Sequence, residues 1–483
     1  MKRFLVFFSI FLFLPINVIA ETYTIDDLLK KGLKESEDIE MVRKELKKVN
    51  HQVKEAWGSA LPKIDFSANY QRAFEQYNPY SSEDAGMGDF PSVTEVLQDS
   101  GVSPMSEPGA YIVGGSLDGI MAGFSDLMPE QKKNTLNYGL EIQQPVFAQG
   151  KVGLGLKIAR EQRASIKAKL DEIENKTAAG IKKSFYEALL AEKNLEVTKK
   201  ALEISKESHK NSLIRFRVGS GSELDTLLSK MALQKNSMSL LEAETGKTLA
   251  FESLASTCGI TEEPADITLS GDFPESQRKE YDYSQVRERF LEGNNVLKQL
   301  LHGEKIQELL VSLSRSDHYP MVYCGASIGK ISQYNKGDEI EWHDNQSVFA
   351  GLSMNIFKGF QIFQKTQQAK AGLESFESSR RKTLKKLELG LKSTYLNLGR
   401  MQENLEQAES LLKVAERGYE VAEKGYKAGS VTITDLQKAE LEQKQANIAL
   451  NAAKYGYYSA VIDLELFTGD AGKTINNSVE ENK

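Results

Sequence analysis

The chain has 483 residues, a formal net charge of −7 and 27% charged side chains. The negative balance argues against nucleic acid as a partner. Beyond the N-terminal segment, no apolar stretch reaches the roughly 20 residues that a membrane-spanning helix needs. If the rest of the protein crosses a membrane, strands must do so, because only helices and closed barrels satisfy the backbone in lipid.

The first twenty residues have the three parts of a secretory signal peptide. Lys2 and Arg3 carry positive charge, residues 4–14 are apolar, and residues 18–20 place small or short side chains before a cleavage site. An uncleaved anchor is the alternative, but the apolar run is short for a span. We expect cleavage after Ala20, and no cysteine follows it that would take a lipid anchor.

The sequence repeats itself once. The stretch Phe-Arg-Val-Gly-Ser at residues 216–220, followed by Asp225, returns as Tyr-Lys-Ala-Gly-Ser at residues 426–430, followed by Asp435. The offset is 435 − 225 = 210, and it relates residues over more than a hundred positions, which indicates two structurally similar halves. The predicted parts are a first repeat, a second repeat and an acidic, disordered tail: residues 21–260, 261–470 and 471–483.

The first half carries an insertion. Pro62 matches Pro320 with an offset of 320 − 62 = 258, so the first half has 258 − 210 = 48 extra residues downstream of Pro62. The extra segment lies at residues 78–133, is rich in Gly, Ser, Pro and acidic residues, and shows no sustained period. We expect it to be a long extracellular loop.

Each half predicts a helix followed by two strands. The first helix is expected to start near Thr24, whose hydroxyl can cap it, and to run to about Trp57. Apolar and polar residues then alternate from Ile64, again from Tyr138, and in the second half at about 319–357. A soluble β-sandwich fits this alternation as well, but strands of about 10 residues and polar faces suited to a wet lumen favour a membrane barrel.

Long helices follow the strands. Apolar and small residues step by three and four from Leu384 to Tyr426 and from Leu436 to Phe467, which predicts coiled-coil packing. A helix over about 359–426 would be roughly 100 Å long at 1.5 Å per residue. Many residues at these stepped positions are Ala, Thr or Gln. Small residues allow helices to approach closely, which suits a wall of many helices. A periplasmic coiled-coil adaptor protein is the alternative.

The predicted strand count bears on the number of copies. Four strands per chain cannot close a barrel, and an open sheet edge in lipid is forbidden. Three copies would supply about 12 strands, within the bacterial range, whereas two would supply about eight, a barrel that side chains fill. A conducting pore therefore favours three copies.

The order of these elements resembles the TolC family of outer-membrane efflux and secretion channel proteins. The matching motifs are the two turn motifs with their acids and the two helix ends: Arg215 to Gly219 with Asp225, Gly425 to Gly429 with Asp435, Cys258-Gly259 and Thr468-Gly469. The resemblance covers nearly all of the mature chain, although the extended loop and the acidic tail are less typical.

The resemblance implies an α+β membrane protein of the cell outer membrane with a long periplasmic portion. Each of two structural repeats would give two transmembrane β-strands and long coiled-coil helices, and a trimeric 12-stranded β-barrel would be continued by a periplasmic α-helical barrel. It further implies a homotrimer in outer-membrane lipid that works with a periplasmic adaptor protein and an inner-membrane transporter of the RND or ABC type. The cargo would be small molecules in efflux or proteins in type I secretion.

The resemblance also points to the turns between the long helices. It implies adaptor-docking tips at Arg217, Val218, Gly219, Ser220, Ala428, Gly429 and Ser430, and a periplasmic entrance gate at Asp225, Asp435, Tyr426 and Lys438. Two family features are missing, because a commonly found arginine is Val431 here and an acid one turn after Asp435 is Lys438. A gate formed by the family's tyrosine, arginine and acid is therefore in doubt.

The same turns have a plainer interpretation. Gly219, Gly221 and Gly429 are expected to supply turn conformations that other residues resist, and Ser222 or Thr432/Thr434 can cap the helices that follow. Two helical hairpins with no gating role would select the same residue types.

The sequence contains no constellation that indicates chemistry. Cys258 and Cys324 fall in a predicted helix end and a predicted strand, so we expect two packing residues, although export would permit a disulfide. The five histidines show no metal-ligand spacing, and no nucleophile elbow or phosphate loop is present. We therefore expect neither enzyme activity nor a cofactor nor a metal site.

Overall fold

The computed structural model describes residues 21–74, 92–100, 113, 116–117, 119–120, 132–260, 267–273 and 281–472. The predicted signal peptide, most of the predicted loop at 78–133, and residues 473–483 of the predicted tail lie outside these ranges. The chain divides into a helical unit and a sheet unit: Met1–Glu55, Gly155–Ser314 and Gln364–Lys483 for the first, and Ala56–Leu154 and Arg315–Phe363 for the second.

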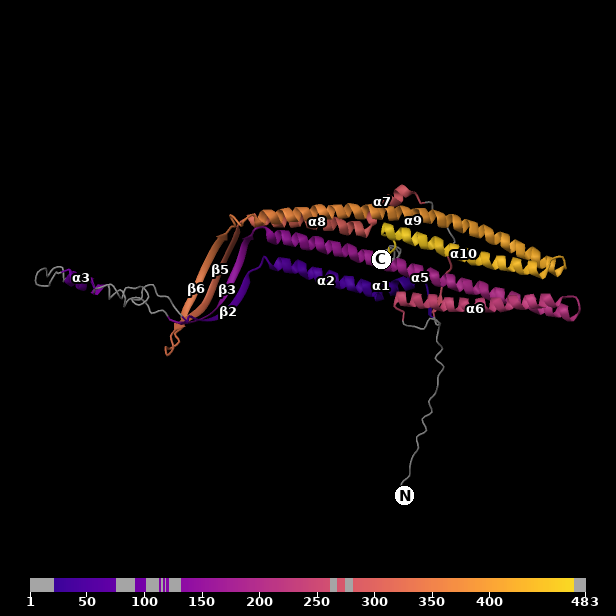
Figure 1. The fold of residues 1–483 in the computed structure, drawn as a ribbon, viewed down its shortest axis with the longest axis horizontal. Coiled ribbons are helices and arrows are strands. Elements are labelled where there is room, and N and C mark those ends of the chain that lie inside the picture. The colour runs from indigo at the N-terminus through magenta and orange to yellow at the C-terminus, as the bar shows by residue number, and fades with distance from the viewer. Residues whose placement is uncertain are drawn as a thin grey trace, which may run out of the picture. The chain divides into compact units, whose positions relative to one another are not determined.

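The sheet unit is built on four antiparallel strands in the order β2-β3-β5-β6 (Figure 1). Their bounds are β2 Lys63–Arg72, β3 Asn134–Ala148, β5 Met321–Tyr334 and β6 His343–Ser353. The register places Ile64 opposite Ile142 and Phe66 opposite Leu140, so apolar residues of neighbouring strands share one face. Strands β2 and β6 are the two edges of this sheet.

Part of the predicted loop is helical. Helix α3 covers Val93–Asp99, and Ser92 caps it by accepting a hydrogen bond from the Glu95 N–H. The Glu95 side chain in turn accepts from the Ser92 N–H, which completes a capping box. The segment that the sequence predicts as a long loop, 78–133, therefore contains a short helix. The reason is a local capping signal too short to show a sustained period.

The predicted first helix is two helices. Thr24 caps α1, Ile25–Glu35, as predicted, and Asp27 completes the capping box. The chain then breaks at Ser36, which is extended at φ −64° and ψ 118°, before α2, Glu37–Gly58. The Ser36 hydroxyl accepts a hydrogen bond from the Ile39 N–H and so restarts the helix.

The second half shows the same break. Helix α7, Tyr283–Gly293, ends at Asn294, and α8, Asn295–Arg315, follows. The Asn294 carbonyl side chain accepts from the N–H groups of Val296 and Leu297. In each half the helix is thus interrupted at a polar residue that caps the next helix.

Four long helices form two hairpins in the helical unit (Figure 1). Helices α5, Lys151–Arg217, and α9, Gln361–Lys427, each have 67 residues, and α6, Glu223–Cys258, and α10, Ile433–Thr468, each have 36. The starts of α5 and α9 differ by 361 − 151 = 210, and those of α6 and α10 by 433 − 223 = 210. A helix of 67 residues is about 100 Å long.

Each hairpin has its own apolar core beside a short helix. In the first, Leu28 and Leu29 of α1 pack with Phe185 and Leu254. The core is closed by β4, Ile267–Leu269, which pairs in parallel with β1, Glu21–Tyr23. In the second, the core residues include Phe290 of α7, Leu391, Leu398 and Leu405 of α9, and Tyr457 and Leu464 of α10. The seven-residue spacing of the α9 leucines is the predicted coiled-coil repeat.

The two cysteines and the start of the predicted tail were also the subject of predictions. Cys258 is fully buried in the first core, as expected, whereas Cys324 is exposed on β5 and is not a packing residue. Both thiols are free, and burial raises the pKa of Cys258 to about 11. Ala471, which the prediction placed in a disordered tail, is buried, so the packed chain continues to that point.

Within the described residues, no helix combines the length and the apolar character that a membrane span requires.

Candidate functional site: the two hairpin turns

The first turn joins α5 to α6 through a left-handed glycine. Gly219 has φ 76°. Its N–H donates to the Phe216 carbonyl at 3.0 Å, and the Ser220 N–H donates to the Arg215 carbonyl at 2.9 Å. These two bonds form a Schellman motif, which satisfies the last carbonyls of α5.

The second turn repeats this backbone between α9 and α10. Gly429 has φ 79°, its N–H donates to the Tyr426 carbonyl at 3.1 Å, and the Ser430 N–H donates to the Gly425 carbonyl at 2.9 Å. The predicted need for glycine at Gly219 and Gly429 is confirmed, because a side chain is disfavoured at this φ. The same prediction for Gly221 was wrong, since its φ does not lie in the left-handed region.

The predicted gate acids lie in the first turns of α6 and α10. The Ser222 hydroxyl accepts from the Asp225 N–H at 3.1 Å, and the Thr432 hydroxyl accepts from the Asp435 N–H at 3.2 Å. The Asp435 carboxylate accepts from the Thr432 hydroxyl at 2.7 Å, while that of Asp225 accepts from the Ser222 N–H at 3.3 Å. Ser222 and Thr432 are thus the helix caps, as predicted, and each aspartate accepts a hydrogen bond from its cap residue.

The seven predicted docking residues are all exposed: Arg217, Val218, Gly219, Ser220, Ala428, Gly429 and Ser430. Lys438 is also exposed, and among the residues that the structure describes no ion pair joins it to Asp435. An ion pair between Lys438 and Asp435, which would neutralise the aspartate, is therefore not formed here.

The space inside each turn is filled from opposite sides. In the first turn a Cβ added at Gly221 would lie 3.0 Å from the Arg215 Cβ. In the second turn a Cβ added at Gly425 would lie 2.4 Å from a Val431 methyl group. In the first turn the larger residue, Arg215, lies on the helix before the turn and the glycine, Gly221, lies after it. In the second turn the glycine, Gly425, lies on the helix and the larger residue, Val431, lies after the turn.

Arg215 connects the two turns. Its guanidinium lies over the Tyr426 ring, 4.5 Å from the ring centroid, within the range of a cation–π contact. Tyr426 was predicted at the entrance but its partner was not, because the family's arginine is expected at the position of Val431. In the repeat Arg215 is equivalent to Gly425, so the second half has no matching side chain.

A buried polar cluster lies farther along the same helices. The Ser205 hydroxyl of α5 donates to a Glu440 carboxylate oxygen of α10 at 3.1 Å and receives a short hydrogen bond from Asn236 of α6. Lys444 donates to the Asn236 side-chain oxygen at 3.1 Å. Burial raises the pKa of Glu440 against the opposing effects of Ser205 and Lys444.

The burial of Glu440 was not predicted, because an acidic residue outside the apolar stripe of a helix is expected at the surface. Only 8% of this residue is exposed. No group of three His, Cys, Asp or Glu side chains in the described ranges is arranged to hold a metal ion.

Comparison with known proteins agrees with this architecture. The family described as outer membrane efflux protein matches residues 123–259 and 286–470. The alkaline protease secretion protein AprF of Pseudomonas aeruginosa is 25% identical over 188 residues, and the match spans 39% of this chain and 39% of that protein's length.

Solved structures share the fold over most of the chain. The CmeC outer membrane channel of Campylobacter jejuni superposes with a TM-score of 0.68 at 17% identity, covering 95% of this chain and 89% of that one. The outer membrane protein VceC of Vibrio cholerae gives 0.67 at 15% identity, covering 92% and 96%. The predicted family and outer-membrane location are thereby confirmed: the chain belongs to the family of outer membrane efflux proteins.

Proposed function

We propose that three copies of the chain form one export channel, with the sheet units closing a 12-stranded β-barrel in the outer membrane and the helical hairpins lining a periplasmic conduit. The observation that carries the proposal is an apolar sheet face that no residue in the described part of the chain covers. Val348 on β6 is 88% exposed, Phe66 on β2 is 68% exposed, and Ile64 is 65% exposed. An uncovered apolar face of this extent fits contact with lipid.

The face is continuous across the sheet because the register aligns it. Phe66 lies opposite Leu140, and Leu140 lies opposite Ile328, so one apolar row runs over three strands. The alternate positions are mostly polar residues or glycine. Ser327 and Ser347, for example, lie opposite each other and share a hydrogen bond of 2.8 Å. One apolar and one polar face is the pattern of a wall between lipid and water.

The sheet edges require a partner. Neither β2 nor β6 has a neighbour on its outer side among the described strands, and an unpaired edge is costly in lipid. Pairing β6 of one copy with β2 of the next closes the barrel, and four strands from each of three copies give about 12, within the range of bacterial barrels.

The hairpin turns are the proposed entrance and docking surface. The exposed tip residues would meet a periplasmic adaptor that connects the channel to an inner-membrane transporter. The Arg215–Tyr426 contact would hold the two turns of one copy together. Asp225 and Asp435 would ring the entrance, and a passage lined by one charge sign favours ions of the other sign. Cargo of both classes, small molecules and exported proteins, fits the efflux family and the secretion relative.

Planar bilayers containing the purified protein test this function. We expect conductance with a reversal potential that shows cation preference in a salt gradient. Asp225→Asn and Asp435→Asn should each reduce the preference while keeping the cap, because the side-chain oxygen of asparagine can still accept the hydrogen bond that each carboxylate accepts from its cap residue. Glu223→Gln, which removes an exposed charge from the same turn as Asp225, is the matched control and should reduce it less. Absence of conductance, or recovery of the protein only in the soluble fraction, would contradict the proposal.

A further inference from the structure

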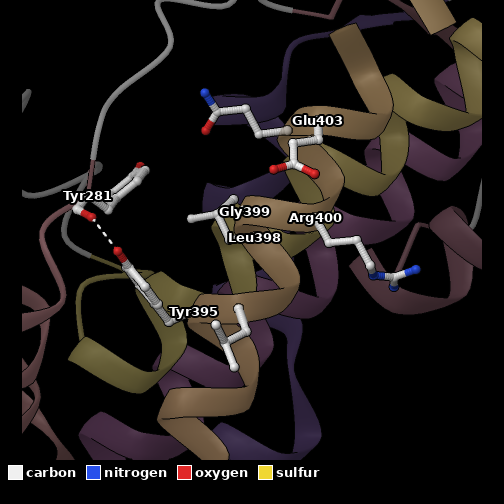
Figure 2. Close-up of a pocket in the computed structure, with 8 residues that line it drawn as sticks. Tyr281, Tyr395, Leu398, Gly399, Arg400 and Glu403 are labelled. Carbon is white, nitrogen blue, oxygen red and sulfur yellow. Dashed lines mark hydrogen bonds between the residues drawn. The ribbon is translucent and has the colours of Figure 1, made fainter. Parts of the chain in front are cut away.

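A buried carboxyl group connects the two hairpins near their turns. Glu440 lies seven positions (440 − 433) after the start of α10, about 10 Å along the helix, and is 8% exposed. Its hydrogen-bond partner is Ser205 of α5, at 3.1 Å. Figure 2 shows the contrasting state of an acidic residue, because Glu403 of α9 lines a pocket and is exposed. Glu440 lacks the water that lets such a group keep its charge at little cost.

The positive charges near Glu440 do not pair with it. Lys444, one turn farther along α10, donates to the Asn236 side-chain oxygen of α6 at 3.1 Å. Burial lowers the pKa of Lys444 against the effect of Glu440, while Lys235 and Glu242 of α6 act on it in opposite directions. Within the ranges that the structure describes, Glu440 forms no ion pair. A charge on this carboxyl would therefore have no direct counter-ion.

The other titratable groups around Glu440 add negative charge or are bonded elsewhere. Tyr419 of α9 stays neutral, because burial and three nearby acids raise its pKa to about 12. These acids are Glu423 of α9, Glu440 itself and Glu207 of α5, so two further carboxylates lie in this region. His209 of α5 bonds to a serine hydroxyl of α6 at 3.0 Å. The surroundings as a whole favour a neutral Glu440.

The hydroxyl of Ser205 has one proton and three polar neighbours. It lies 2.9 Å from the Ala201 carbonyl and 3.1 Å from Glu440, and it accepts a short hydrogen bond from Asn236. Lys444 fixes the direction of the last bond, because an ammonium only donates and therefore faces the Asn236 oxygen. With the Ser205 proton on the Ala201 carbonyl, the remaining lone pair of the hydroxyl is left for Glu440.

We propose that Glu440 carries a proton in this packed arrangement and donates it to the Ser205 hydroxyl, which makes the contact between α10 and the first hairpin dependent on pH. Each group of the cluster then has a partner. A charged Glu440 would compete with the Ala201 carbonyl for a single proton, at a place where burial penalises charge.

The direction of the pH dependence follows from burial, which raises the pKa of Glu440 above the ordinary value of 4.5. The contact is at full strength below that value, where the carboxyl is protonated in the packed and in the separated state. It weakens as the pH rises through the raised pKa, because the packed state must then give up its proton or hold a buried charge. The inference does not depend on the proposed channel function, because the contact lies within one chain.

The hairpin packing itself does not require this cluster. The offset of 210 places Ala415 and Ala446 at the positions equivalent to Ser205 and Asn236, and Glu440 corresponds to the exposed Lys230 of α6. Because alanine occupies the matching places in the second hairpin, we expect small substitutions in the cluster to leave the fold intact.

Backbone hydrogen exchange in the full-length protein in detergent tests the inference. The readout is the exchange of α10 amides at 436–446 by mass spectrometry, from pH 4.5 upward, in wild type relative to Glu440→Gln at the same pH. Glutamine imitates the protonated carboxyl and does not titrate. We expect the ratio to rise by up to tenfold per pH unit until the pH reaches the pKa of Glu440. Glu442→Gln, at an exposed neighbour, is the matched control and should keep the wild-type trend.

The direction of the hydrogen bond is tested with Ser205→Ala. We expect it to speed exchange roughly fivefold at low pH, where a neutral hydrogen bond is lost, and by less at high pH. Ser212→Ala removes another buried hydroxyl of α5, one that has no partner among the described residues, and should change exchange little. Two outcomes would overturn the inference. One is a ratio of wild type to Glu440→Gln that is constant or falls with pH. The other is an effect of Ser205→Ala that grows with pH, since a charged Glu440 would then be accepting from Ser205.

Discussion

The two hairpin turns have the same backbone and opposite side-chain arrangements. Both use a left-handed glycine, a Schellman motif and a hydroxyl cap with an acid at the third helical position. The first turn then places Arg215 against Gly221, and the second places Val431 against Gly425. At these two positions each turn has one glycine and one larger residue, and the two halves differ in which position is the glycine.

The consequence is an asymmetry between equivalent positions. Arg215 has a side chain that extends to Tyr426 on the other hairpin, whereas its counterpart Gly425 has none. A similar exchange occurs at the other end of the hairpins. Gly293 packs on the end of α10 at the position equivalent to Glu35 beside α6. Matched substitutions in the two halves can therefore separate what the backbone requires from what each side chain adds.

The largest expected effect is at Gly293. A Cβ there would lie 2.0 Å from the Thr468 carbonyl oxygen, which is backbone and cannot rotate away. We expect Gly293→Ala to destabilise the protein by about 1–3 kcal/mol, the usual cost of overpacking. Glu35→Ala, at the exposed equivalent position, should change stability by less than about 0.5 kcal/mol. Thermal unfolding in detergent compares them, and equal shifts would contradict the asymmetry.

The next effect is at the second turn. Gly425→Ala should cost about 1–2 kcal/mol, because its Cβ meets a stiff β-branched side chain. The double variant Gly425→Ala with Val431→Gly imitates the first turn and should recover most of that loss. Non-additivity in this double-mutant cycle is the measurement. Additive losses would show that the two residues do not share the space.

A smaller effect, dependent on pH, is expected at Glu440. Burial raises its pKa in the folded state above the ordinary value of 4.5. The stability it contributes is therefore present below that value and is lost as the pH rises through the folded-state pKa. The melting temperature of Glu440→Gln relative to wild type should increase over this window. Glu442→Gln, an exposed neighbour, should show no such trend, and a flat difference for Glu440→Gln would contradict the burial argument.

The smallest effect is expected at Arg215. A cation–π contact at a partly exposed site contributes about 0.5–1 kcal/mol, so Arg215→Gln should change the ratio of open to closed channels by roughly two- to fivefold. Single-channel recording in bilayers measures the ratio. Arg217→Gln, at the exposed tip, is the control and should leave it unchanged. Equal effects of the two variants would show that net charge, not the Tyr426 contact, controls opening.

Local signals in the sequence predicted several features well. Thr24, Ser222 and Thr432 were identified as caps because hydroxyl capping depends on a few neighbouring residues. The seam leucines Leu391 and Leu398 were predicted because burial on a long helix follows a fixed period.

Long-range features were not predicted. The Arg215–Tyr426 contact joins residues 211 positions apart (426 − 215), and the burial of Glu440 depends on Ser205 of another helix. Neither leaves a periodic trace. The break at Ser36 was missed because apolar residues continue in helical rhythm across it, and only the cap on Ile39 marks it.

Closure of a shared barrel is the central claim, and cross-linking of the sheet edges tests it most directly. In a Cys324→Ser background, cysteines would be placed at successive positions of β2 and β6 in the full-length protein, extracted from the membrane in detergent and oxidised. The account predicts that some registers give disulfides only between chains, with a ladder of covalent dimer and trimer and nothing larger. A bond within one chain, a ladder past three, or no cross-link at any register would contradict it.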